Sequence, residues 1–374
     1  MTTPETSKLF TPWRNLASGV ESLILTERLA PVQRQFYFTN PNMTSDGRFM
    51  WVACSYPPEG GRHAIPVLAV VDFEQDEMRV CHETQFSCES PLVDPENGDV
   101  YWTNETDLWR RGPHPEDRPV LINRFPRALA KGRRINHIAV DLTFSADRTS
   151  VNLNAEIGNE EWLVGDMPLD GSPVRIWQSS DCRDVHCQFS PTDPDLQLLV
   201  RDYWGRKPET FDPQFRYHRM YLLRRGQQPE PLLAEPITHH GHEWWDADGK
   251  HVWYVHYGIG VKRVSLDTRR EENLWPGHLA HAHADWTGRY LVTDMMASPY
   301  KPDCHVAFRN LTTGRETEIV NSPPLADGLT QCGHLHPHPQ FCCNDRYICY
   351  TTTAHNRVDL ALVRTEDVVA RTQP

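Results

Sequence analysis

One short phrase recurs seven times along the chain and limits its fold more than any other feature. Each copy has polar or His residues, an apolar residue, a turn of the Ser/Pro-Asp-Gly kind and then an apolar strand. Clear copies are NPNMTSDGRFMWVA from Asn40, HEWWDADGKHVWYV from His242 and HPQFCCNDRYICYTT from His338. The copies are roughly 40 to 60 residues apart, which is the length of one four-stranded propeller blade.

The chemistry of this phrase indicates how the copies assemble. An Asp-Gly pair supplies the positive φ of a tight hairpin turn, and the apolar flanks have the pattern of strands. One such sheet cannot bury both faces alone, whereas seven around an axis bury each sheet between two neighbours. We therefore predict an all-β chain that forms a seven-bladed β-propeller. The alternatives are a six- or eight-bladed propeller with one miscounted blade, and a pair of β-sandwiches.

We expect residues 1–374 to form a single domain, because no second kind of pattern interrupts the repeat. The predicted blades start near residues 40, 90, 140, 186, 242, 281 and 336.

Charge and composition exclude several classes of partner. The net charge of −12 argues against a nucleic-acid binder, although local Arg residues could still bind a small anion. No run reaches the about 18 apolar residues of a membrane span. The N-terminal segment has no basic stretch followed by an apolar run, so we expect no signal peptide and a cytoplasmic location.

The ten cysteines contain no CxxC pair, which favours reduced thiols over a disulfide framework.

Histidines gather in three late clusters, ITHHGHEWW, GHLAHAHADW and QCGHLHPHPQF, each at the start of a repeat phrase. The innermost strand of a blade starts there and faces the central channel. Because side chains alternate along a strand, a His-x-His pair places both rings on one face. Imidazole is a common ligand of Zn, Mn, Fe, Ni and Cu. The clusters therefore predict a metal site in the channel, and the ligand type does not choose the metal. The pairs with this spacing are His281-Ala-His283, His334-Leu-His336 and His336-Pro-His338.

At these clusters the sequence resembles the oligogalacturonate lyases, a family of seven-bladed propellers that degrade pectin fragments. The resemblance is carried, in the family's order, by YFTNPNMTSDGR, HRMYLL, GHEWWDADG, HAHADWTG and QCGHLHPHPQFCCND. It implies a metal-dependent lyase that cleaves anionic uronic-acid oligosaccharides by β-elimination. The family's metal is typically Mn²⁺.

The resemblance also implies roles for individual residues. His242 would be the general base, and Arg219 would assist at the substrate carboxylate. The implied metal ligands are His281, Gln331, His336 and His338.

The Gln ligand is where this chain departs from the family. The family has Gln three residues before its first ligand His, and aligning HPHP with His336 leaves Gly333 at that position. We keep Gln331 on the assumption of a two-residue insertion. Two alternatives stay open, namely His334 in place of His338 and His283 in place of His281.

Two other kinds of function are compatible with a propeller. One is a non-catalytic propeller that binds a protein, and the other is a metal-dependent sugar-acid enzyme of another class, such as a hydrolase or epimerase. The sequence also leaves open which uronate is cleaved, the preferred chain length and the oligomeric state.

Overall fold

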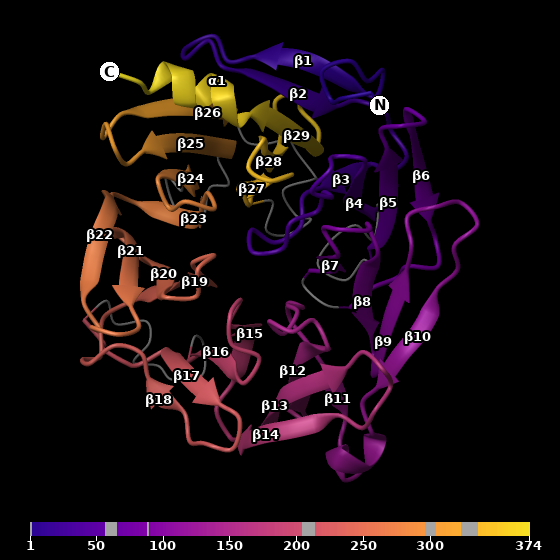
Figure 1. Ribbon diagram of the computed structural model, residues 1–374, viewed down its shortest axis with the longest axis vertical. Helices are drawn as coiled ribbons and strands as arrows, with labels where there is room; N and C mark the ends of the chain where they lie inside the picture. Colours follow the sequence, from indigo (N-terminus) through magenta and orange to yellow (C-terminus); the bar gives the residue numbers. More distant parts are fainter. Residues whose placement is uncertain (1, 57–65, 88–89, 204–213, 296–303, 323–335) are drawn as a thin grey trace.

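A computed structural model describes residues 2–56, 66–87, 90–203, 214–295, 304–322 and 336–374. Within these residues, seven antiparallel β-sheets are arranged around a central axis (Figure 1). Six sheets have four strands and one has five. This arrangement confirms the predicted all-β fold, a seven-bladed β-propeller.

The blades follow one another in chain order. Blade one consists of β3 (Val32–Arg34), β4 (Phe49–Ser55), β5 (Val67–Asp72) and β6 (Glu77–Cys81). Blade two consists of β7 (Leu92–Val93), β8 (Val100–Asn104), β9 (Asp107–Arg111) and β10 (Val120–Arg124). Blade three consists of β11 (Ile135–His137), β12 (Ser150–Ile157), β13 (Glu161–Pro168) and β14 (Arg175–Ser180).

The strands of the next three blades have the same order. Blade four consists of β15 (Asp184–Phe189), β16 (Leu196–Arg201), β17 (Met220–Arg224) and β18 (Glu230–Pro231). Blade five consists of β19 (His240–Trp245), β20 (His251–His256), β21 (Gly260–Ser265) and β22 (Glu271–Pro276). Blade six consists of β23 (Leu279–Ala284), β24 (Tyr290–Met295), β25 (Cys304–Asn310) and β26 (Glu316–Ser322).

Blade seven is built from both ends of the chain. Its strand order is β27 (Gln340–Cys342), β28 (Tyr347–Thr352), β29 (Asp359–Arg364), β2 (Glu21–Leu25) and β1 (Phe10–Arg14). Leu23 pairs with Leu362, and Ile24 pairs with Ala361. Both termini lie at this blade in Figure 1, and helix α1 (Thr365–Arg371) follows β29. The N-terminal strands therefore close the ring by satisfying backbone groups along β29.

The repeated turn takes the conformation that its residues predict. Gly47, Gly98, Gly249 and Gly288 have φ values of 82°, 80°, 69° and 65°. Glycine adopts this left-handed region without steric cost, so each hairpin can turn tightly. In blade three Arg148 takes the same role with φ 57°.

Large apolar side chains fill the space between neighbouring blades. Trp51 of β4 packs with Val100 and Trp102 of β8 in one buried cluster. The Trp51 indole donates a hydrogen bond to the carbonyl oxygen of Gly98, at 2.9 Å. Each blade thus buries its faces against its neighbours, which is the packing that the repeat predicts.

Two further observations concern the described residues as a set. Their free cysteines are Cys54, Cys81, Cys182, Cys187, Cys342, Cys343 and Cys349. Of the helices in this part of the chain, none has the length and apolar character needed to cross a membrane. The prediction that residues 1–374 form a single domain stays a prediction.

Candidate metal centre and active site

Three successive blades carry a histidine on the strand nearest the axis, where the sheet ladder is distorted. His186 lies in β15, His242 in β19 and His281 in β23, and Figure 1 shows these strands around the centre. His186 and His242 have φ values of 47° and 53°, which non-glycine residues rarely adopt. Bulges of this kind redirect a side chain, and strained backbone often marks functional positions. The register shifts lie between Val185 and Gln188, between Gly241 and Trp244, and between Leu279 and Ala282.

The imidazoles of His281, His336 and His338 converge on one point. One nitrogen from each ring lies within 4.8 Å of the others. The His281 ring centroid is 4.7 Å from that of His336 and 4.3 Å from that of His338. His336 Nδ1 and His281 Nε2 are 3.4 Å apart. Two nitrogens bound tetrahedrally to one metal at about 2.1 Å would be about 3.4 Å apart, so this donor set fits a divalent cation.

A buried carboxylate, Asp294 of β24, holds two of these histidines. Its oxygens accept a hydrogen bond from the His281 backbone N–H at 2.7 Å and lie 2.9 Å from His281 Nδ1. The backbone N–H of His338 also donates to Asp294, at 3.3 Å. A carboxylate on one ring nitrogen orients the other nitrogen toward a metal. Burial raises the pKa of Asp294 to about 6, against an opposing effect of His336.

His242 lies directly against this group. Its ring centroid is 3.8 Å from that of His281. Its Nδ1 is 2.8 Å from the carbonyl oxygen of Ala280 and 3.0 Å from the hydroxyl of Tyr257. Burial, and then the neighbouring His281, lower the pKa of His242 well below its ordinary value. The neutral imidazole is therefore the stable form at this position.

Arg219, which precedes β17, is held by two carboxylates. Its Nε donates to Glu243 Oε1 at 2.7 Å, and its Nη1 donates to Asp202 Oδ1 at 3.0 Å. Burial alone would lower the pKa of Arg219, but Glu243 and Asp202 raise it, so the guanidinium stays charged. A guanidinium has five N–H donors, and these two contacts use one on Nε and one on Nη1.

The structure separates His281 from its sequence neighbour His283. The bulge in β23 interrupts the alternation that would place both rings on one face. His281 joins the three histidines that could hold a metal ion, whereas His283 Nδ1 accepts the backbone N–H of Phe341 at 3.2 Å. Gln331 and His334 lie outside the described residues.

His336 and His338 converge without the extended strand that their spacing suggests. Both precede β27, and His338 has φ 46°. Their rings nevertheless both contact His281. The irregular backbone around Pro337, rather than strand alternation, therefore brings this pair to the site.

Sequence reasoning missed two kinds of site residue. The signal for Asp294 was a lone acidic residue in the apolar strand YLVTDM, and Tyr37 gave no signal of its own. The Tyr37 ring is stacked on His186 at 5.3 Å and makes edge contacts with His338 at 5.1 Å and His281 at 6.0 Å. Tyr37 therefore connects the three histidines that could hold a metal to the imidazole of His186.

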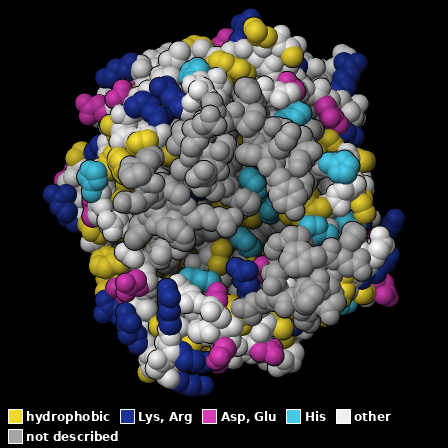
Figure 2. All heavy atoms as spheres, turned by 180° about the vertical axis from the view of Figure 1, so that it is seen from behind, with side chains coloured by type: hydrophobic (Ala, Val, Ile, Leu, Met, Phe, Trp, Pro, Cys, Tyr) yellow, Lys and Arg dark blue, Asp and Glu magenta, His cyan; other side chains and the backbone are white. Residues whose placement is uncertain are grey.

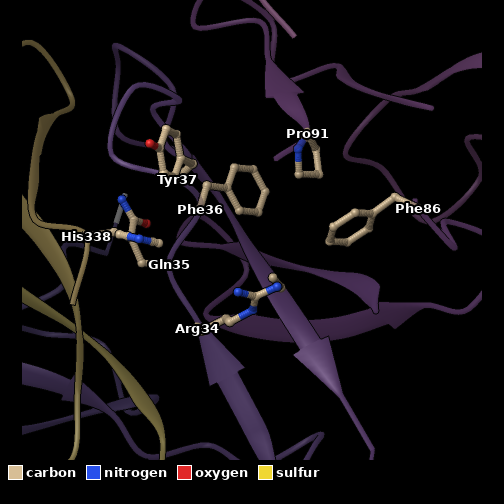
Figure 3. Close-up of a pocket in the computed structure, with 8 residues that line it drawn as sticks. Arg34, Gln35, Phe36, Tyr37, Phe86, Pro91 and His338 are labelled. Atoms are coloured by element: carbon tan, nitrogen blue, oxygen red, sulfur yellow. The ribbon is translucent and has the colours of Figure 1, made fainter. Parts of the chain in front are cut away.

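Figure 2 shows one face of the propeller, with histidine side chains gathered around the hollow at its middle. A pocket adjoins His338 and Tyr37, with the Arg34 side chain on its other side (Figure 3). Its lining consists of Arg34, Gln35, Phe36, Tyr37, Ala53, Phe86, Pro91 and His338.

Comparison with known proteins finds likeness in structure but not in sequence. No protein-family model matches the chain, and no curated protein matches it. Similar solved structures include an oligogalacturonate lyase in complex with manganese, with TM-score 0.73, 14% identity, and 97% of this chain and 98% of that chain covered. The oligogalacturonate lyase of Vibrio parahaemolyticus has TM-score 0.74 and 14% identity, with 95% and 96% covered.

These likenesses concern the fold. Both lyases share the seven-bladed architecture over nearly the whole chain, which confirms, for the fold, the resemblance found in the sequence. A chain in the crystal structure of the mitotic checkpoint complex is also similar, with TM-score 0.53, 9% identity and 89% of each chain covered. Likeness at such low identity concerns the fold and does not define an activity.

Proposed function

We propose that the chain is a metal-dependent lyase that cleaves uronic-acid oligosaccharides, similar to oligogalacturonate, by β-elimination. The observation that carries the proposal is the group of His281, His336 and His338, held by Asp294, in direct contact with His242. The two oligogalacturonate lyases of similar structure, one of them in complex with manganese, support it. We further propose that the enzyme acts in the cytoplasm as a single domain.

In this proposal His281, His336 and His338 hold Mn²⁺, with Gln331 as a fourth ligand. A cation bound there would offset the charge of the substrate carboxylate and act as a Lewis acid on it. Asp294 contributes by fixing the His281 ring, because a partner on Nδ1 leaves Nε2 directed at the group.

The remaining residues bind the substrate and move the proton. Arg219 binds the uronate carboxylate through N–H groups beyond those given to Glu243 and Asp202. His242 removes the proton from C5, next to that carboxylate. The electron pair forms a double bond between C4 and C5 while the bond from C4 to O4 breaks. No water is consumed, and the unsaturated product absorbs in the ultraviolet.

The proposal is tested by separating the base from the ligands. His242→Ala should lower the elimination rate by about 10²–10⁴-fold, because general base catalysis is lost. Its bound metal should remain, whereas His338→Ala should lose the metal. His283→Ala is the matched control, since it removes a half-buried histidine of the same strand as His281 that lies outside the group.

Metal content is measured by elemental analysis and elimination by the ultraviolet absorbance of the product. Full lyase activity in protein that has been stripped of metal would contradict the metal mechanism. Cleavage without the ultraviolet product would instead favour a hydrolase on the same scaffold.

A further inference from the structure

His186 forms a second His-centred unit in the channel that the proposed base and ligands do not use. Its Nδ1 lies 2.5 Å from Asp141 Oδ2. The Asp141 side chain is 1% exposed, whereas the His186 side chain is 24% exposed. Because Nδ1 faces a buried carboxylate, Nε2 is the ring nitrogen left for a contact with a bound substrate.

The position of His186 relative to the metal-binding histidines is fixed by packing. Its ring stacks on Tyr37, and the same Tyr37 ring contacts His281 and His338. One aromatic ring therefore separates His186 from the metal-binding group.

The position relative to the proposed base is fixed by a hydrogen bond between blades. Gln188 Nε2 donates to the carbonyl oxygen of Glu243 at 2.7 Å. Gln188 is two residues after His186, and Glu243 follows His242. Both histidines have left-handed backbone at bulges on the innermost strands of adjacent blades. Two adjacent blades therefore hold imidazoles at corresponding positions on their innermost strands.

We propose that His186, positioned by Asp141, is the general acid that protonates the leaving oxygen of the eliminated sugar. This inference rests on the lyase function proposed above. It identifies the residue that carries out the second proton transfer of that reaction. A sugar alkoxide is a poor leaving group, so elimination at a uronate gains from a proton donor at O4.

The proposed step balances as follows. His242 takes the C5 proton, the electron pair of that C–H bond becomes the C4–C5 double bond, and the pair of the C4–O4 bond goes to O4. The N–H of His186 gives its proton to O4, so the leaving sugar departs as an alcohol. His242 ends protonated and His186 ends neutral, and exchange with solvent restores both.

The charges around His186 favour its protonated form. Burial lowers its pKa, but the Asp141 carboxylate raises it, and the net effect places the pKa above its ordinary value. Arg219 acts against protonation and Glu243 acts for it. Other titratable neighbours among the described residues include Tyr37, His137 and His242.

The test compares two substrates with different leaving groups. One is a digalacturonate without a double bond. The other is a galacturonate whose O4 carries a 4-nitrophenyl group, so that 4-nitrophenolate leaves as a stable anion without taking up a proton. The variant is His186→Asn, because the Asn amide can still donate to Asp141 but has no group in place of Nε2. Initial rates are measured from ultraviolet absorbance, with metal content determined for each protein.

His186→Asn should slow elimination of the disaccharide by about 10²–10⁴-fold and leave the nitrophenyl substrate near the wild-type rate. His242→Ala should slow both substrates. Equal losses of His186→Asn on both substrates, or no loss on either, would overturn the assignment. Failure of the wild-type protein to eliminate either substrate would instead refute the lyase function itself.

Asp141→Asn supplies a second measurement. With the carboxylate gone, His186 should lose its proton at lower pH, so the alkaline fall of disaccharide activity should move to lower pH. The nitrophenyl substrate should show no such movement. An unchanged profile on the disaccharide would contradict the role of Asp141.

Discussion

Replacing Asp294 with Asn tests whether one buried carboxylate organises the proposed metal centre. Asp294 accepts the backbone N–H of His281 at 2.7 Å, contacts His281 Nδ1 at 2.9 Å and accepts the backbone N–H of His338 at 3.3 Å. Asn keeps the size of the side chain and one acceptor oxygen but loses the charge. A His281 ring without a carboxylate partner is a weaker and less oriented ligand.

The expected effect follows from what such partners contribute in metal sites. Loss of a carboxylate behind a ligating histidine lowers metal affinity by about 10–100-fold. That range corresponds to about 1.4–2.7 kcal/mol of binding free energy. Because Asp294 contacts two of the proposed ligands, we expect a value near the upper end. Isothermal titration of the metal-free protein with Mn²⁺ measures the affinity directly.

The control must remove a carboxylate of equal burial away from the site. Asp184 of β15 is 0% exposed and pairs with Arg201, so Asp184→Asn should lower the free energy of unfolding by an amount comparable to Asp294→Asn. It should leave Mn²⁺ affinity unchanged. Wild-type affinity in Asp294→Asn, with circular dichroism showing an intact fold, would refute the reasoning that this carboxylate positions the ligands.

Two further predictions concern stability. His240 is 2% exposed, and burial lowers its pKa to about 3, so between that pKa and its ordinary value the unfolded chain binds more protons. Stability should therefore fall as the pH falls, by about 3 kcal/mol between pH 7 and pH 4, and His240→Asn should flatten this slope in urea unfolding measured at a series of pH values. Ile24 is 0% exposed and lies in the strand that closes blade seven, so Ile24→Ala should lower the free energy of unfolding by about 2–5 kcal/mol. The control is Thr11→Ala, at an exposed position of the paired strand β1, and it should change the free energy of unfolding by less than about 0.5 kcal/mol. Equal effects of the two variants would argue against closure of the ring through β2.

Much of the fold could be predicted because the signals that specify a blade are local. In four of the repeated hairpin turns a glycine lies at the position that requires a positive φ, namely Gly47, Gly98, Gly249 and Gly288. The strands of each hairpin are formed by the residues directly before and after the turn. Counting the repeat therefore counts the blades. The clusters around His242, His281 and His338 likewise recur at the starts of inner strands, so their approach to the axis follows from the repeat itself.

Other parts of the site depend on contacts between distant residues. A bulge in β23 sends His281 and His283 to different neighbours, and the residue alternation of the sequence contains no sign of that bulge. Asp294 reaches His281 only because β24 pairs with β23, and Tyr37 reaches the site from blade one. Arg219 meets Asp202 and Glu243 through two different blades.

The sequence by itself determined the number of blades, the turn chemistry and the supply of imidazoles. Tertiary structure alone decided which imidazoles share a point, which carboxylates hold them and which strands complete the last blade. Strand periodicity and turns depend on residues a few positions apart, so they can be recognised in the sequence. Ladder register, bulges and the packing of one blade on the next are set by chain segments tens to hundreds of residues apart, and their geometry exists only in the folded ring.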